Sequence, residues 1–188
     1  MESITNFLNA QNFKLNSQHE QLFMNYVEQV NFKKNDTIIL EGEQSNFLYY
    51  IISGIVRGYY IDKNGSEKTK CFSSENEFFC TEGLRTNREA TFSIQCIEDV
   101  TCLKIPYKII DRICCESLQV DNFVKHCYTL QVTKLENRQK TLLINDATER
   151  YDWFCETFPT LHSRLPLMYI ASYIGIHCAS LSRIRKNK

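Results

Sequence analysis

The sequence predicts an α+β protein with three successive parts: a jelly-roll-like double-stranded β-helix, one long helix and a small helical domain. Residues 30–106 alternate apolar and polar side chains between glycines, which is typical of short strands in a barrel or sandwich. Residues 118–145 continue a helical pattern beyond the length of most globular helices. Residues 166–186 then divide into two short helices around Gly175.

The composition favours a packed globular protein. Of 188 residues, 43% are hydrophobic, with 12 Phe and 10 Tyr, which is ample for a core. No apolar run approaches the roughly 20 residues that span a bilayer. Residues 1–15 lack the basic start and apolar centre of a signal peptide. We therefore expect a cytoplasmic protein with no membrane partner.

Side chains that could carry chemistry do not form the pattern of an enzyme or a metalloprotein. The cysteines number nine and are never spaced C-x-x-C, so we expect mostly buried free thiols rather than disulfides, a zinc site or an iron–sulfur cluster. Residues 30–106 contain no histidine, which argues against a cupin-type enzyme. A Gly-rich phosphate loop is also missing. We expect no enzyme activity, no metal and no cofactor.

The N-terminal segment predicts two helices before the strands begin. Apolar side chains recur at helical spacing in two groups, Ile4, Phe7 and Leu8, then Leu22, Phe23, Tyr26 and Val27. Ser17 followed by Glu20 predicts a capping box at the start of the second helix.

The strand region contains one strong hairpin signal. Asn64-Gly65 predicts a two-residue type I′ turn, which needs positive φ at both residues. Residues 89–106 predict two further strands that are separated near Glu98-Asp99, and residues 107–117 predict a short helix.

The predicted long helix suggests an interface between two copies of the chain. A small domain cannot cover a helix of this length, so we expect a homodimer; packing of the helix on its own β-domain is the alternative. Asp146 and Glu149 predict a capping box for a new helix that Pro159 ends, so residues 144–146 are the expected hinge. The apolar positions of the long helix include Phe123, Cys127, Leu130, Leu135, Leu142 and Leu143.

Residues 166–186 predict a helix-turn-helix. Pro166 suits the first turn of a helix, Gly175-Ile176 the turn, and Cys178 the start of the second helix. Ala171, four residues before Gly175, is small enough for a close helix crossing. The expected apolar seam consists of Ile170, Ile174, Ile176, Leu181 and Ile184.

The C-terminal part of the chain is basic, although the formal net charge of the whole chain is zero. No Asp or Glu follows Glu156, whereas Lys and Arg continue to Lys188, so residues 1–156 are acidic in balance. Cations on a reader helix bind DNA phosphates, and Arg183 suits the edge of a guanine. The expected DNA-binding residues are Arg164, His177, Cys178, Ala179, Ser180, Ser182, Arg183, Arg185 and Lys186.

Two segments carry a resemblance to a known family. YIASYIGIHCASLSRIRK, residues 169–186, strongly resembles the helix-turn-helix of the Crp/Fnr family of bacterial transcription regulators. EGEQSNFLYYIISGIVRGYY, residues 41–60, resembles the β-roll of that family, and the order of elements along the whole chain is similar. The resemblance implies a homodimer that binds a two-fold symmetric site in double-stranded DNA, with RNA polymerase as a further candidate partner.

The resemblance does not extend to the residues that hold cyclic AMP. Family members that bind it use a Gly-Glu pair and an Arg followed by a small hydroxyl residue. Here Glu82-Gly83 is reversed, and Ala90-Thr91 stands where the Arg and the hydroxyl residue belong. Arg88 lies two residues earlier, a displacement of roughly 6–7 Å along a strand. Glu82, Gly83, Arg88 and Thr91 are therefore a candidate pocket for an unidentified effector, not for a cyclic nucleotide.

These observations predict a sequence-specific DNA-binding transcription regulator of Crp/Fnr type that is not controlled by cyclic AMP. Its expected parts are residues 1–117 (N-terminal helices and β-roll sensor), 118–145 (dimerisation helix and hinge) and 146–188 (helix-turn-helix). The alternative is a β-roll that binds a ligand or a protein, with C-terminal helices that dock a protein partner. We expect no β-hairpin wing after the reader helix, because the sequence stops at Lys188.

Overall fold

The computed structural model describes residue 7 and residues 15–187, which form two compact units. Of the described residues, unit 1 comprises residue 7 and residues 15–60 and 72–125, and unit 2 comprises residues 61–71 and 126–187. The architecture is the predicted one: a β-roll, a long helix and a set of small C-terminal helices. The first of the two predicted N-terminal helices, through Ile4 and Leu8, falls outside the described residues.

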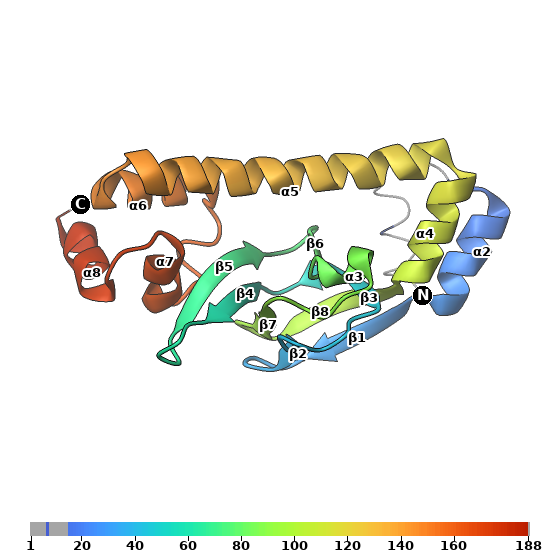
Figure 1. Ribbon diagram of the computed structural model, residues 1–188, viewed down its shortest axis with the longest axis horizontal. Helices are drawn as coiled ribbons and strands as arrows, with labels where there is room; N and C mark the ends of the chain where they lie inside the picture. The colour runs from blue at the N-terminus through green and yellow to red at the C-terminus, as the bar shows by residue number, and fades with distance from the viewer. Residues whose placement is uncertain (1–6, 8–14, 188) are drawn as a thin grey trace. The chain divides into compact units, whose positions relative to one another are not determined.

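Two four-stranded sheets form the β-roll (Figure 1), with strand orders β1-β8-β3-β6 and β2-β7-β4-β5. The strands are β1 Glu28–Phe32, β2 Thr37–Ile39, β3 Phe47–Ser53, β4 Val56–Ile61, β5 Glu67–Ser73, β6 Phe78–Phe79, β7 Ser93–Cys96 and β8 Val100–Pro106. Strands distant in the sequence pair antiparallel, such as β3 with β8, where Phe47 lies opposite Pro106. This pairing of early with late strands is the predicted double-stranded β-helix, and β7 and β8 separate at Glu98-Asp99 as expected.

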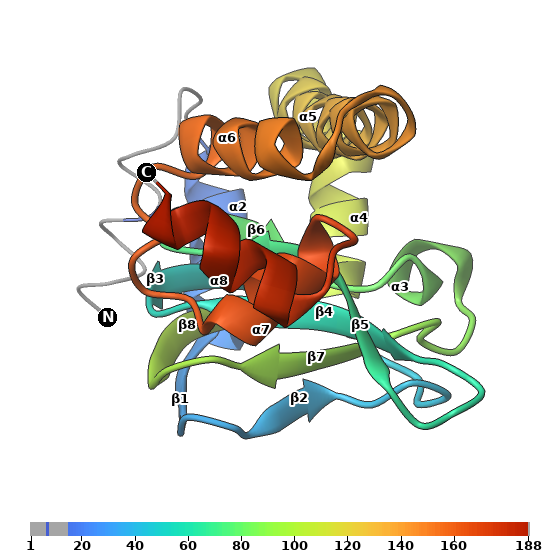
Figure 2. The same cartoon turned by 90° about the vertical axis from the view of Figure 1, so that its left-hand side faces the viewer.

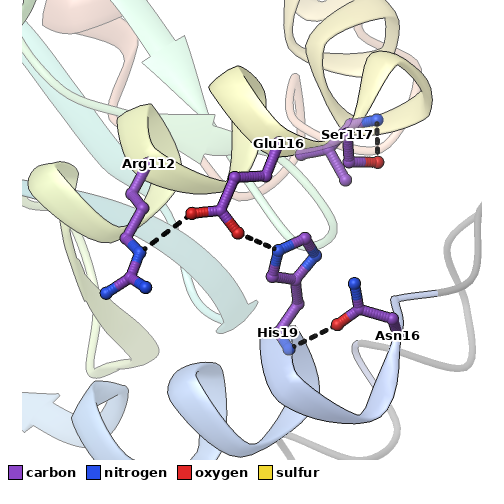
Figure 3. A network of polar contacts seen from close by, with 6 residues as sticks. Asn16, His19, Arg112, Glu116 and Ser117 are labelled. Carbon is purple, nitrogen blue, oxygen red and sulfur yellow. Dashed lines mark hydrogen bonds and ion pairs between the residues drawn. The ribbon is translucent and has the colours of Figure 1, made fainter.

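In unit 1 the helices α2 (Ser17–Tyr26) and α4 (Tyr107–Glu116) lie side by side (Figure 1). His19 is buried, and its Nε2 donates a hydrogen bond to Glu116 Oε2 at 2.9 Å (Figure 3). Glu116 also accepts from Arg112 Nε at 3.1 Å, and these two contacts, that with His19 first, lower the pKa of the Glu116 carboxyl. The buried imidazole of His19 therefore has a hydrogen-bond partner, and this bond joins α2 to α4.

The predicted capping box of α2 is wrong by one residue. Asn16 is the N-cap, and its side-chain oxygen accepts from the His19 amide at 2.8 Å. Asn and Ser are equally good N-cap residues, so the residue types alone could not show which of the two neighbours begins the helix.

Aromatic and aliphatic side chains join α2 to the first sheet. The ring centroids of Phe7 and Tyr50 lie 4.6 Å apart, and those of Phe7 and Phe23 lie 5.5 Å apart. Complete burial of a side chain of this size stabilises the fold by about 1.5–3 kcal/mol. The buried members of this cluster are Phe7, Phe23, Val27, Tyr50, Leu103 and Ile105.

The turn of the β4–β5 hairpin differs from the predicted type I′ turn. Gly65 has φ of +76°, but Asn64 is not among the residues with positive φ. The Gly65 amide donates to Asp62 O, and the Asp62 carboxylate accepts from the amides of Asn64 and Ser66, each at 2.9 Å. The bonds from the amides of Ser66 and Asn64 lower the pKa of the Asp62 carboxyl. Because Asp62 binds the amides of its own loop, the connection between β4 and β5 is longer than the two-residue turn that Asn-Gly predicts.

Unit 2 contains the rest of α5 (Leu118–Ile144) and the helices α6 (Ala147–Thr157), α7 (Leu167–Tyr173) and α8 (Cys178–Lys186), seen in Figure 2. Asp146 caps α6, and both hydrogen bonds of the predicted capping box with Glu149 are present. The helices α5 and α6 are separated at Asn145 and Asp146, within the expected hinge. The core of unit 2 includes an aromatic cluster of Trp153, Phe154, Phe158 and Tyr173.

All nine cysteines are free thiols. Cys96 and Cys102 are buried in β7 and β8, and burial raises the pKa of each thiol to about 12. Cys115 and Cys178 are exposed. The other five are half-buried, so the expectation of mostly buried thiols is confirmed only for Cys96 and Cys102 and is wrong for the set as a whole.

Thiol alkylation at pH 8, followed by peptide mass spectrometry, separates the two classes. We expect Cys115 and Cys178 to react first, and Cys96 and Cys102 to react only when the protein unfolds. A pKa of about 12 leaves roughly one thiol in ten thousand deprotonated at this pH. Rapid labelling of Cys96 or Cys102 in the native protein would contradict the packing of the roll.

Candidate nucleic-acid interface

The helices α7 and α8 are joined by a tight turn at the predicted position. Gly175 has φ of +70°, a left-handed conformation that favours glycine. The Ile176 amide donates to Ala171 O at 3.0 Å and closes the end of α7. In the predicted seam Ile170, Ile174 and Leu181 are buried, whereas Ile176 and Ile184 are half-buried.

The opposite side of α8 is polar and exposed. Its last turn carries three cations, Arg183, Arg185 and Lys186, which is the end of a helix where positive charge is favourable. Arg164 is exposed as well, but it lies in the loop before α7 rather than on α8. Of the other predicted DNA-binding residues, His177, Cys178 and Ala179 are exposed, and Ser180 and Ser182 are half-buried.

Arg185 has a different setting from Arg183. It lines an open cavity of about 460 Å³ together with Tyr151, Asp152, Cys155, Glu156 and His162. The two carboxylates on α6 offset its charge toward the cavity, whereas Arg183 and Lys186 are not among the lining residues. The cationic surface of α8 is therefore carried most strongly by Arg183 and Lys186.

Two arginines that the sequence did not single out fix the position of the turn. Arg150 on α6 donates from Nη2 to Leu142 O at 2.8 Å, from Nε to Asn145 O at 2.9 Å and from Nη1 to Ile174 O at 3.4 Å. Arg138 on α5 donates to Tyr173 O from Nε at 3.0 Å and from Nη2 at 2.9 Å. Its guanidinium also lies over the ring of Tyr173, with Cζ 4.5 Å from the ring centroid.

These arginines satisfy backbone carbonyls that the ends of α5 and α7 leave without an intrahelical partner. Each guanidinium has five donors in a fixed plane, so it can bind several carbonyls at once. Because the acceptors are backbone atoms from distant parts of the chain, side-chain identity gave no local signal for this role.

The predicted effector residues lie around the short helix α3 (Gly83–Thr86) of unit 1. Gly83 is buried, and its carbonyl accepts from the Arg88 amide at 2.9 Å. The side chains of Glu82, Arg88 and Thr91 are exposed, whereas Ala90 is only 3% exposed. The backbone thus brings Gly83 and Arg88 together, but it does not direct the Arg88 side chain into the roll.

Among residue 7 and residues 15–187, no helix combines the length and the apolarity needed to cross a membrane. In the same part of the chain, His, Cys, Asp and Glu side chains do not gather in the groups of three that a metal ion would need.

Comparison with known proteins shows which domain family part of the chain resembles and which fold it shares. Residues 29–117 match the cyclic nucleotide-binding domain family. The chain is 23% identical over 187 residues to the anaerobic regulatory protein of Pasteurella multocida, with 92% of this chain and 67% of that protein covered.

Two solved structures share the fold of most of the chain. FixK2 from Bradyrhizobium japonicum has a TM-score of 0.78 at 17% identity, covering 86% of this chain and 83% of that one. A protein from Eubacterium rectale assigned to the Crp/Fnr family has a TM-score of 0.74 at 18% identity, covering 92% and 83%. The resemblance of the sequence to Crp/Fnr regulators is therefore confirmed, and these likenesses establish the fold.

Substitution of Gly175 tests the turn between α7 and α8. We expect Gly175→Ala to lower the free energy of unfolding by about 1–2 kcal/mol, because alanine disfavours positive φ and its Cβ would lie 3.3 Å from Leu142 Cδ2. Gly65→Ala is the matched control, since Gly65 also has positive φ but nothing lies within 4 Å of its Cβ position. Urea unfolding that shows an equal or smaller loss for Gly175→Ala would contradict the described packing.

Proposed function

We propose that this protein, with its cyclic nucleotide-binding domain and Crp/Fnr fold, is a dimeric transcription regulator that binds a specific sequence in double-stranded DNA. The observation that carries the proposal is the α7–α8 pair, in which a buried apolar seam leaves an exposed cationic helix. A helix held in this way can enter the major groove, as the second helix of a helix-turn-helix does. The regulators that share the fold support the same assignment.

In this proposal α8 is the reader helix. Arg183 is exposed and can pair bidentately with a guanine edge, which is the commonest specific contact of an arginine. Lys186 and Arg164 supply phosphate contacts, and Arg185 contributes less because carboxylates face it across the cavity. The first turn of α8 offers Cys178 and Ala179, whose weak or apolar contacts suit a thymine methyl group.

The dimer interface would be formed by α5. Tyr128, Val132, Leu135 and Leu143 are 37%, 53%, 47% and 75% exposed, and at 100° per residue they fall within an arc of about 80° on this helix. An exposed apolar stripe at this spacing suits a second copy of the same helix. Two copies would present two reader helices to the two halves of a symmetric site.

The effector of this regulator would not be cyclic AMP. Ala90, which stands where the phosphate-binding arginine is expected, is buried and carries no charge. Arg88 is exposed and lies in the loop before β7 rather than on a strand, so it does not supply the missing charge-assisted pair for a phosphate inside the roll. We therefore propose that binding to DNA needs no cyclic nucleotide.

Selection of bound sequences from random double-stranded DNA, without added nucleotide, tests the function. We expect a palindromic motif with the wild-type protein and its loss with Arg183→Ala, because that side chain is the main base-reading candidate. Lys108→Ala removes an exposed charge from α4 and is expected to leave the motif unchanged. If no motif emerges, even with cyclic nucleotides or cell extract added, the C-terminal helices dock a protein instead.

A substitution on α5 tests the dimer. Leu135→Glu places a charge in the proposed interface, so we expect a monomer in analytical ultracentrifugation and a loss of DNA affinity of roughly a hundredfold or more. Leu130→Glu is the matched control: Leu130 is 48% exposed but lies on the opposite side of the helix. If Leu130→Glu dissociates the dimer and Leu135→Glu does not, the assigned interface is wrong.

A further inference from the structure

The tip of the β4–β5 hairpin, residues 61–71, belongs to the same compact unit as α7 and α8. The Thr69 amide donates to Ser172 Oγ at 2.9 Å, and Ser172 Oγ donates to Glu67 O at 3.5 Å. Ser172 is on α7, so this pair of bonds joins β5 to the first helix of the α7–α8 pair. Thr69 is only 2% exposed.

Arg138 on α5 adds further hydrogen bonds to this contact. Its Nη2 donates to Thr69 O at 3.2 Å and to Tyr173 O at 2.9 Å. One guanidinium therefore bridges the hairpin and the C-terminal end of α7. Together with Ser172, it satisfies both the amide and the carbonyl of Thr69.

The position of β5 in its sheet explains why these backbone groups are available. β5 is the edge strand in the order β2-β7-β4-β5, and an edge strand presents amides and carbonyls that no neighbouring strand can pair. Buried backbone groups of this kind need partners. Ser172 and Arg138 supply the hydrogen-bond partners that a neighbouring strand would otherwise give to Thr69.

We infer that the hairpin tip holds the reader helix in position, and that Arg138 and Ser172 are positioning residues for DNA binding; this role rests on the proposed function. The cations of α8 remain exposed while α7 is held, so the contact does not block the reader surface. Because α7 is held in place, α8 has less conformational freedom before binding and therefore loses less conformational entropy when it binds DNA. Residues 61–71 are continuous in the chain with β4 and with the end of β5, so the contact is covalently joined to strands of the roll.

Amide hydrogen exchange tests the contact without DNA. In Ser172→Ala the Thr69 amide loses its acceptor, and in Arg138→Gln the bridge to Thr69 O is lost, so we expect faster exchange in the segment 67–71 of both variants. Lys140→Gln removes an exposed charge from the same helix and is the matched control. Unchanged exchange in both variants would show that the hairpin is not docked and would overturn the inference.

DNA affinity then tests the positioning role. We expect both variants to bind the selected duplex roughly tenfold more weakly, while the dimer in ultracentrifugation and the binding of Lys140→Gln stay unchanged. Faster exchange with unchanged or tighter DNA binding would overturn the positioning role. If the wild-type protein itself binds no DNA, the proposed function and the positioning role fail together, whereas the exchange result still decides whether the hairpin contact exists.

Discussion

The carbonyl groups that end α5 and α7 need donors, and two arginines from other elements supply them. Arg150 bonds to Leu142, Asn145 and Ile174, and Arg138 bonds to Tyr173. A charged donor to a buried carbonyl contributes about 1.5–3 kcal/mol, and its loss leaves the acceptor unsatisfied. Because each guanidinium spans more than one helix, these bonds set where the turn at Gly175 lies relative to the C-terminal half of α5.

In the proposed dimer, this constraint would connect the interface helix α5 to the proposed reader helix. The apolar stripe and Arg138 belong to the same helix, so any change in how two copies of α5 pack would act on α7 through a short, polar and directional contact. A regulator needs two arrangements with different affinities for DNA. The arginine contacts and the hairpin contact are discrete hydrogen bonds that are either made or broken, which suits such a pair of states.

Local signals in the sequence were enough to predict most elements. The capping box of Asp146 and Glu149, the positive φ at Gly175 and the break at Glu98-Asp99 each depend on neighbouring residues, and each was predicted correctly. The errors also arose locally, where two residues compete for one role. Asn16 rather than Ser17 caps α2, and Asp62 reorganises the loop that Asn64-Gly65 was expected to form.

Long-range contacts could not be predicted in the same way. Arg138 bonds to Thr69, 69 residues earlier in the chain, and His19 bonds to Glu116, 97 residues away. Nothing in the local pattern of either residue distinguishes it from a surface cation or an isolated histidine. The α8 residues could be grouped from the sequence because one helix presents them together, whereas the groups that bond to α7 and its turn come from three separate elements, α5, α6 and β5.

The dependence of DNA affinity on salt tests the account most directly. A dimer that contacts at least four phosphates should show a slope of log affinity against log salt of roughly −4, so that affinity falls on the order of a hundredfold between 50 and 200 mM salt. Lys186 and Arg164, each present in two copies of the proposed dimer, provide the charges for such a slope. A slope near zero with the selected duplex would contradict a phosphate-bound reader helix and would favour an apolar protein interface.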